Sequence, residues 1–132
     1  MANLLIVDDE LGMRQFLTHL FQREGHVVRV AENGRVALEQ LREQTPDLII
    51  SDYRLRNGKT GIEAIARLRE AVATPIPAFL MSGDTDLDVV RQAEESGLPL
   101  LHKPVEPAAL RTMLADTLKR PAITTNDVAG VA

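Results

Sequence analysis

The sequence has 132 residues, 45% of them hydrophobic, which is enough for one globular domain with one core and leaves no room for a second. Its formal net charge is -4, and because the 15 lysine and arginine residues are scattered along the chain, the composition disfavours direct binding to nucleic acid. The absence of cysteine excludes disulfides and cysteine-based sites, and since neither a signal peptide nor a membrane-spanning apolar segment is evident, we expect a cytoplasmic protein.

Short apolar segments alternate along the chain with segments of helical periodicity. The apolar segments are nearly continuous, as expected of strands buried on both faces of a parallel sheet, and they cover residues 4–7, 27–30, 48–50, 78–81 and 98–101. The clearest helix follows the first strand, where Met13, Phe16, Leu17, Leu20 and Phe21 share one helical face and Gly25 supplies a left-handed stop. Further helices are predicted over residues 36–41, 62–68 and 87–95 and after Pro107. This order predicts five βα units and an α/β fold.

Residues 121–132, PAITTNDVAGVA, show no periodicity and are mostly small or polar. Such a composition is typical of a segment that does not pack on a core. We therefore expect one domain over residues 1–120, followed by a flexible C-terminal tail or a truncated linker over residues 121–132.

Residues with reactive side chains follow four of the five predicted strands. In an open parallel sheet the functional site lies outside the carboxyl ends of the strands, so these residues should be considered together. They are Asp8, Asp9 and Glu10 after the first strand, Asp52 after the third, Ser82 and Gly83 after the fourth, and Lys103 and Pro104 after the fifth. Several carboxylates, one hydroxyl and one ammonium group are thus predicted to converge on one edge of the sheet.

The convergence of carboxylates predicts a divalent cation. Crowded carboxylates either raise one pKa or recruit a cation, and a single lysine cannot balance them. One or two carboxylates, with the other positions left to water and phosphate, are the usual environment of Mg²⁺. A carboxylate beside such an ion can attack phosphorus and form an aspartyl phosphate, while the metal, the lysine and the hydroxyl neutralise the phosphoryl oxygens.

Four short motifs, DDE, SDY, MSGD and HKP, follow the predicted strands in this order. Together they resemble the receiver domain of two-component response regulators, and the resemblance extends over roughly residues 3 to 119. The longer strings DYRLRNGKTGIEAI, MSGDT and SGLPLLHKPV are similar to the receivers of hybrid sensor histidine kinases. The resemblance implies a CheY-like, flavodoxin-like fold with a doubly wound, five-stranded parallel sheet of strand order 2-1-3-4-5.

The resemblance also implies an acceptor and a set of metal ligands. Asp52 would accept a phosphoryl group from a sensor histidine kinase or a histidine phosphotransfer domain. Asp9 would bind Mg²⁺ directly and Asp8 would bind it from the outer shell or through water. Asp52 itself and the backbone carbonyl of Arg54 would complete the protein ligands.

Ser82 and Lys103 would each bind a phosphoryl oxygen, and the bond between Lys103 and Pro104 would be cis, which is a minority state for proline in general. The phosphorylated domain would change conformation in the loop and helix over residues 82–97. It would thereby control a protein partner, with no membrane and no nucleic acid contacted directly. The domain would also catalyse its own phosphorylation and dephosphorylation.

The sequence departs from the common receiver pattern in three places. The loop after Asp52 is one residue longer and has Gly58 and Gly61 in place of the usual proline. Leu100 stands where many receivers carry a tyrosine or phenylalanine that switches rotamer, which puts the usual output mechanism in doubt. Arg54 and Asp84 lie at the two positions where the family tunes the lifetime of the phosphoryl group.

Each motif also has a purely structural explanation. The acids at 8–10 could cap a helix that begins near Leu11, Asp52 and Ser82 could occupy ordinary turns, and Lys103 could be a solvated lysine. The charges at 56–59 are most simply those of a solvated loop, although that loop could also contact a kinase. Four chemically suitable residues at successive strand ends are nevertheless hard to attribute to chance.

Two other classes of function compete with a receiver. A phosphatase with an aspartyl nucleophile could use the same fold, but it needs a second acid two residues beyond the nucleophile, and Arg54 occupies that position. A nucleotide-binding or flavin-binding domain is the other alternative. It is disfavoured because no glycine-rich phosphate-binding motif follows the first strand.

Overall fold

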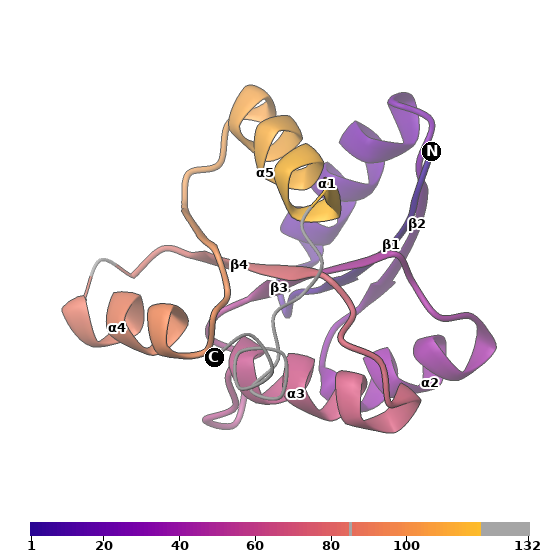
Figure 1. Ribbon diagram of the computed structural model, residues 1–132. Coiled ribbons are helices and arrows are strands. Elements are labelled where there is room, and N and C mark those ends of the chain that lie inside the picture. Colours follow the sequence, from indigo (N-terminus) through magenta and orange to yellow (C-terminus); the bar gives the residue numbers. More distant parts are fainter. Residues whose placement is uncertain (85, 120–132) are drawn as a thin grey trace.

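The computed structural model describes residues 1–84 and 86–119, and within them strands and helices alternate along the chain (Figure 1). In chain order the elements are β1 (Asn3–Val7), α1 (Leu11–Arg23), β2 (Val27–Ala31), α2 (Gly34–Glu43), β3 (Leu48–Asp52), α3 (Gly61–Val72), β4 (Ala78–Ser82), α4 (Leu87–Glu95), β5 (Leu100–His102) and α5 (Pro107–Lys119). The predicted succession of five βα units is confirmed. The predicted tail at 121–132 lies outside the described residues.

The five strands form one parallel sheet of order β2-β1-β3-β4-β5, as predicted. Helices α1 and α5 cover one face of this sheet, and α2, α3 and α4 cover the other (Figure 1). Because both faces are covered, the central strands are apolar at nearly every position, which is why they read as continuous runs in the sequence. In β1, for example, Leu4 and Ile6 face α1 and α5, whereas Leu5 and Val7 face the opposite layer.

The boundaries of the fifth strand were predicted wrongly, as residues 98–101 instead of Leu100–His102. Leu98 is buried, but its N–H donates to the carbonyl of Ala93 at 3.0 Å and therefore belongs to the C-terminal cap of α4. Gly97 makes this cap possible because its φ of 71° is in the left-handed region. The strand can form only after Pro99, which has no N–H to donate.

Two helices begin earlier and end later than their hydrophobic stripes predicted, since such stripes mark only the buried face of a helix. Helix α2 is capped by Asn33, whose side chain accepts from the N–H of Val36, and α3 is capped by Thr60, whose side chain accepts from the N–H of Glu63. The cap of α3 also fixes the end of the loop that follows Asp52.

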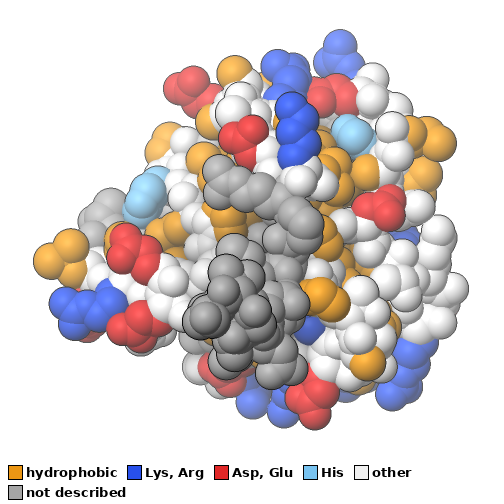
Figure 2. Space-filling model, in the orientation of Figure 1, with side chains coloured by type: hydrophobic (Ala, Val, Ile, Leu, Met, Phe, Trp, Pro, Cys, Tyr) orange, Lys and Arg blue, Asp and Glu red, His pale blue; other side chains and the backbone are white. Residues whose placement is uncertain are grey.

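Acidic and basic side chains are interspersed on the face of the molecule shown in Figure 2. This distribution agrees with the scattered charges of the sequence. Among the described residues, no helix combines the length and the apolar character needed to cross a membrane.

Candidate functional site

The predicted site residues meet at the carboxyl edge of the sheet. Asp52 is the last residue of β3, Ser82 is the last residue of β4, and Lys103 directly follows β5. Together they contribute to the lining of an open cleft of about 650 Å³, whose other lining residues are Asp9, Glu10, Arg54, Gly83 and Asp84. Asp8 is fully buried and lies next to this cleft, within reach of Asp52. Parallel strands end on the same side, so the convergence follows directly from the topology.

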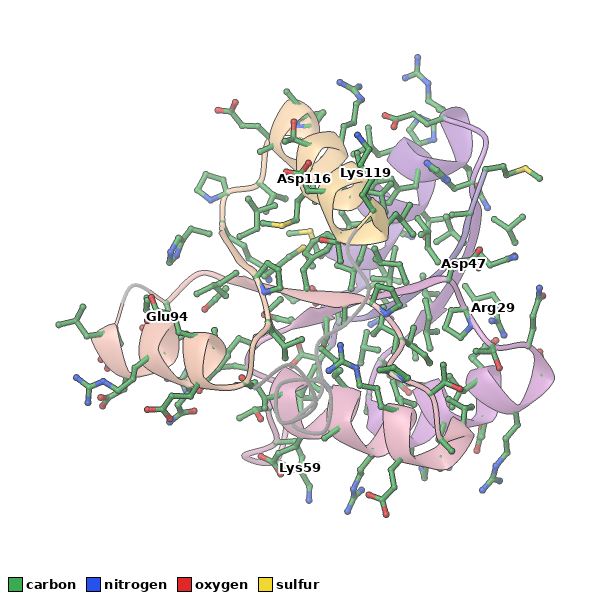
Figure 3. The ribbon with its side chains drawn as sticks, in the orientation of Figure 1. Arg29, Asp47, Lys59, Glu94, Asp116 and Lys119 are labelled. Atoms are coloured by element: carbon green, nitrogen blue, oxygen red, sulfur yellow. The ribbon has the colours of Figure 1, made fainter. Side chains whose placement is uncertain are left out.

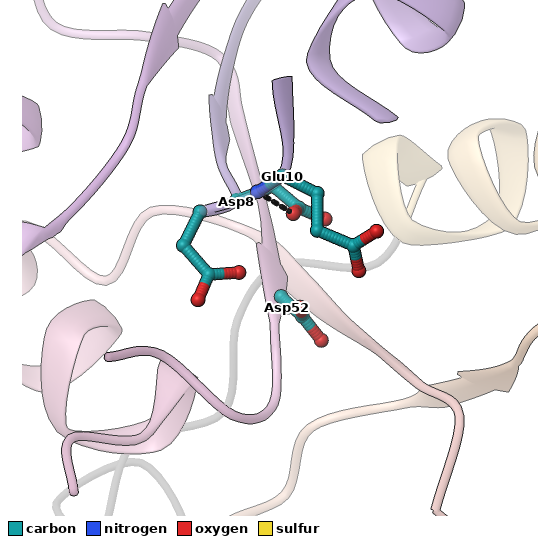
Figure 4. Close-up of side chains that lie close together, drawn as sticks. Asp8, Glu10 and Asp52 are labelled. Atoms are coloured by element: carbon teal, nitrogen blue, oxygen red, sulfur yellow. Dashed lines mark hydrogen bonds between the residues drawn. The ribbon is translucent and has the colours of Figure 1, made fainter. Parts of the chain in front are cut away.

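Four carboxylates lie close together at the site. Asp8, Asp9, Glu10 and Asp52 each offer an oxygen atom within 4.8 Å of the others. Figure 4 shows Asp8, Glu10 and Asp52 together, with a hydrogen bond of 2.8 Å from the N–H of Glu10 to Oδ1 of Asp8. Glu10 is the N-cap residue of α1, but its side chain makes no capping hydrogen bond. Helix capping therefore does not explain the acidic triplet.

One oxygen of this cluster is orphaned. Among the described residues, Oδ2 of Asp8 is buried without a hydrogen-bond partner. A buried carboxylate oxygen without a hydrogen bond is costly, and the ammonium group of Lys103, 3.6 Å away, is shared with other carboxylates, so a further cation or donor would stabilise this oxygen. The donor set of carboxylate oxygens suits a hard divalent ion such as Mg²⁺.

The pKa values of the buried carboxyl groups also show that negative charge in the cluster is not fully compensated. The pKa of Asp52 is raised from 3.8 to about 6, by burial first and then by the charge of Asp8, while Lys103 only partly opposes these two effects. Burial also raises the pKa of Asp8. The charged forms of both carboxyl groups are thus destabilised in the metal-free protein, and a bound cation would stabilise them.

Lys103 is the cation at the centre of the site. Its Nζ lies 3.3 Å from Oδ2 of Asp52, 3.6 Å from Oδ2 of Asp8 and 3.7 Å from Oε1 of Glu10. Burial by itself lowers the pKa of Lys103, but the charges of Asp52 and Asp8 outweigh burial and the net shift is upward. The peptide bond to Pro104 is cis, as predicted. One ammonium group shared by three carboxylates cannot neutralise them.

Ser82 and Arg54 both engage the loop that follows β4. Oγ of Ser82 accepts a hydrogen bond of 3.0 Å from the N–H of Asp84. The guanidinium of Arg54 holds the Asp84 carboxylate, with Nη2 at 2.7 Å and Nε at 3.0 Å from Oδ2, and lies 5.6 Å from the ring centre of Tyr53. The hydrogen bond from the N–H of Asp86, followed by that from Arg54, lowers the pKa of Asp84. An ion pair therefore joins the two loops on either side of the cleft.

The unusual loop after Asp52 is a small β-hairpin. Arg54 and Thr60 form an antiparallel bridge, and Asn57 and Gly58 have φ values of 63° and 70°, as a two-residue type I′ turn requires. The N–H of Gly61 donates to the carbonyl of Tyr53 at 2.7 Å, and a Cβ on Gly61 would lie 2.3 Å from the carbonyl oxygen of Asp52. Gly58 thus supplies the positive φ of the turn, and Gly61 is the one described glycine at which an added Cβ would clash.

Two contacts of the site were not anticipated. Nε of Arg56 lies 3.7 Å from Oδ2 of Asp9, although the charges at 56–59 were interpreted as a solvated loop. The hydroxyl of Tyr53 donates to Oε1 of Gln92 on α4, a residue far away in the sequence. The Asn-Gly dipeptide could have indicated the hairpin that carries Arg56, but no local pattern points to the contact between Tyr53 and Gln92.

Comparison with known proteins identifies the family and agrees with the fold. The family described as "Response regulator receiver domain" matches residues 4–115. The transcriptional regulatory protein AfsQ1 of Streptomyces coelicolor is 35% identical over 120 residues, covering 91% of this chain and 52% of AfsQ1. The sporulation initiation phosphotransferase F of Bacillus subtilis is 33% identical over 94 residues, covering 71% of this chain and 74% of that protein. The chain thus spans about half the length of the first relative and about three quarters of the second.

A solved structure agrees as well. The chemotaxis protein CheY4 of Vibrio cholerae superposes with a TM-score of 0.80 at 29% identity, covering 89% of this chain and 98% of that one. Motifs, fold, site geometry and relatives all lead to the same assignment: the chain is a response regulator receiver domain of two-component signalling and belongs to that family.

Proposed function

We propose that the domain accepts a phosphoryl group on Asp52 from a phosphohistidine, with the help of Mg²⁺. The observation that carries this proposal is the position of Asp52, which ends β3 between a cluster of uncompensated carboxylates and Lys103. The carboxylate lies in a cleft that is open to solvent, so a donor can approach it.

The metal would be held by Asp9 and Asp52, by Asp8 from the outer shell, and by the backbone carbonyl of Arg54. The lack of a hydrogen bond to Oδ2 of Asp8 supports this assignment, because water bound to the cation would donate one. When bound, Mg²⁺ offsets the negative charge that the carboxylates and the phosphoryl oxygens bring together.

The chain's own residues divide the remaining chemistry. An oxygen of Asp52 attacks phosphorus, the bond between phosphorus and the imidazole nitrogen of the donor breaks, and the imidazole leaves with the bonding electron pair. Lys103 would pair with a phosphoryl oxygen, which its distance of 3.3 Å from Asp52 supports, and the Ser82 hydroxyl in the same cleft would donate to another. Attack of water on the acyl phosphate reverses the modification, so the domain would also catalyse its own dephosphorylation.

The signal would leave the site through residues 82–97. In the resting state the Ser82 hydroxyl accepts from the N–H of Asp84, so turning toward a phosphoryl group would release that loop. The loop leads into α4 through Asp86, whose side chain caps the helix. Leu100 packs against the core cluster that contains Val89 and Ala93 of α4. It has no aromatic ring that could change rotamer, so it can respond only by repacking. The hydrogen bond between Tyr53 and Gln92 links the residue after the acceptor to α4 by a second route.

A sensor histidine kinase or a histidine phosphotransfer domain would be the donor, in the cytoplasm, and a protein contacted through α4, β5 and α5 would be the target. A hybrid histidine kinase is one setting for such a receiver. The phosphatase alternative is not favoured, because Arg54 is bound to Asp84 and cannot protonate a leaving group.

Intact-mass spectrometry after incubation with acetyl phosphate and Mg²⁺ tests the proposal. We expect one added phosphoryl group in the wild type and none with excess chelator. Because a phosphatase would instead release phosphate continuously from added monoesters, the same samples should be assayed with such a substrate. Labelling that persists in the chelator, or steady turnover of monoesters, would contradict the proposal.

A further inference from the structure

The hairpin after Asp52 carries a cation to the metal site. Its turn is fixed by Asn57 and Gly58, and the N–H of Leu55 donates to the carbonyl of Lys59 at 2.9 Å. Leu55 is 6% exposed and anchors the hairpin in the core. Because the backbone is held at the base and at the tip, the position of Arg56 is set by the fold.

Arg56 is the counter-ion of Asp9. Nε of Arg56 lies 3.7 Å from Oδ2 of Asp9, and this is the one ion pair of Asp9 among the described residues. Lys103 pairs with Asp8, Glu10 and Asp52, so the two cations divide the four carboxylates between them. The second cation is supplied by a loop that differs from the common receiver form.

A guanidinium and a divalent ion cannot both neutralise Asp9 without repelling each other. The guanidinium has room to move, because a cavity of about 470 Å³ lies beside the hairpin and is lined by Asp9 and Arg56. Its lining is of mixed charge, with the acids Glu32 and Glu63 and the bases Arg35, Lys59 and Arg67. Arg56 is mostly exposed, so moving it breaks no packing. The structure thus contains a cation that competes with the metal for Asp9, together with open space into which its side chain can move.

We propose that Arg56 is a built-in counter-cation of Asp9 that the divalent ion must displace, so that Arg56 sets the metal affinity of the site. The inference rests on the proposed metal site and adds to it a residue that determines how much Mg²⁺ the domain needs before it can be phosphorylated. It assigns Arg56 as a positioning residue that acts through Asp9.

The test is direct titration of the full chain with Mg²⁺. Tyr53 is the single tyrosine and there is no tryptophan, so intrinsic fluorescence reports from the residue next to Asp52, and amide NMR shifts of Asp9 give a second readout. Arg56→Gln should lower the Kd for Mg²⁺ roughly two- to fivefold, the scale expected for one exposed ion pair. This increase in Mg²⁺ affinity should become smaller at high ionic strength, where exposed ion pairs are screened.

Two further variants separate the ion pair from a general change of charge. Lys59→Gln removes the same charge from the same hairpin, but Lys59 points outward (Figure 3) and takes part in none of the ion pairs of the described residues. We expect it to change the Kd by less than half as much as Arg56→Gln. Arg56→Lys keeps the charge and should restore most of the wild-type affinity.

Equal Kd values for Arg56→Gln and Lys59→Gln, or weaker binding by Arg56→Gln, would overturn the inference while leaving the proposed function intact. A wild type that shows no saturable Mg²⁺ binding would instead refute the proposed metal site and this inference with it. NMR spectra of each variant establish that it is folded, and Arg56→Ala, which should behave as Arg56→Gln does, provides a second variant of the same position.

Discussion

Replacing Asp52 with asparagine should stabilise the metal-free domain. The pKa of Asp52 is raised from 3.8 to about 6, by burial first and then by the charge of Asp8, so the folded protein binds a proton there more tightly than the unfolded chain does. Charged Asp52 therefore costs stability above about pH 6, and this cost is relieved as the pH falls from about 6 to about 4. At 1.36 kcal/mol per pKa unit, the full cost is about 3 kcal/mol.

Asparagine keeps the shape of the side chain and is neutral at every pH. In the presence of a chelator, Asp52→Asn should raise the free energy of unfolding by about 1–3 kcal/mol at about pH 7.5, and the gain should disappear near pH 4. For a domain of this size the shift in melting temperature is on the order of 5–10 °C. Saturating Mg²⁺ should stabilise the wild type, because the ion binds the folded state only. It should thereby reduce the difference in free energy of unfolding between Asp52→Asn and the wild type.

Urea unfolding followed by circular dichroism between about pH 4 and about pH 8 provides the measurement. Asp116 on α5 is exposed (Figure 3), and Asp116→Asn serves as a control that should change stability by less than about 0.5 kcal/mol at any pH. The reasoning about buried charge would be refuted if Asp52→Asn were less stable than the wild type at neutral pH. It would also be refuted if the stabilisation by Asp52→Asn were the same at about pH 4 as at neutral pH.

Gly61→Ala should destabilise the domain by about 1–3 kcal/mol or more, because the new Cβ would clash with the carbonyl of Asp52. A Cβ at Gly12 meets no atom within 4 Å, so Gly12→Ala should not destabilise the domain. Urea unfolding gives the free energy of unfolding of both variants. Asp9→Ala should leave the fold intact but abolish Mg²⁺ binding by titration and labelling by acetyl phosphate, and normal labelling would argue against Asp9 as a ligand. Ser82→Ala should still be phosphorylated but should lose the amide-exchange changes over residues 82–97 that beryllofluoride produces in the wild type; unaltered changes would exclude the Ser82 route. Leu100→Ala should lower stability by about 1–3 kcal/mol while keeping those exchange changes, and their loss would show that Leu100 takes part in switching.

That the candidate site residues lie together could be predicted from the sequence, because topology alone brings them together. Asp8, Asp52, Ser82 and Lys103 follow strands that are parallel, so their convergence needed no knowledge of side-chain conformations. The five strands were recognisable for a related reason, since burial on both faces leaves continuous apolar runs.

What the sequence did not predict depends on geometry between distant segments. The start of β5 was missed because Leu98 is apolar like a strand residue but is bound to the end of α4. The Asn57-Gly58 turn is a local signal, but the contact of Arg56 with Asp9 joins the hairpin to the end of β1, and no local pattern relates these two segments. The hydrogen bond from Tyr53 to Gln92 joins two elements that no local periodicity relates.

Locating the phosphoryl group tests the central claim most directly. After labelling with acetyl phosphate and Mg²⁺, borohydride reduces an aspartyl phosphate to homoserine, and trypsin releases the peptide of residues 43–54, which contains both Asp47 and Asp52. Fragmentation of this peptide should place homoserine at position 52 in the wild type, and no homoserine should form in Asp52→Asn or without Mg²⁺. Homoserine at position 47 or in another peptide, or undiminished labelling of Asp52→Asn, would contradict the account.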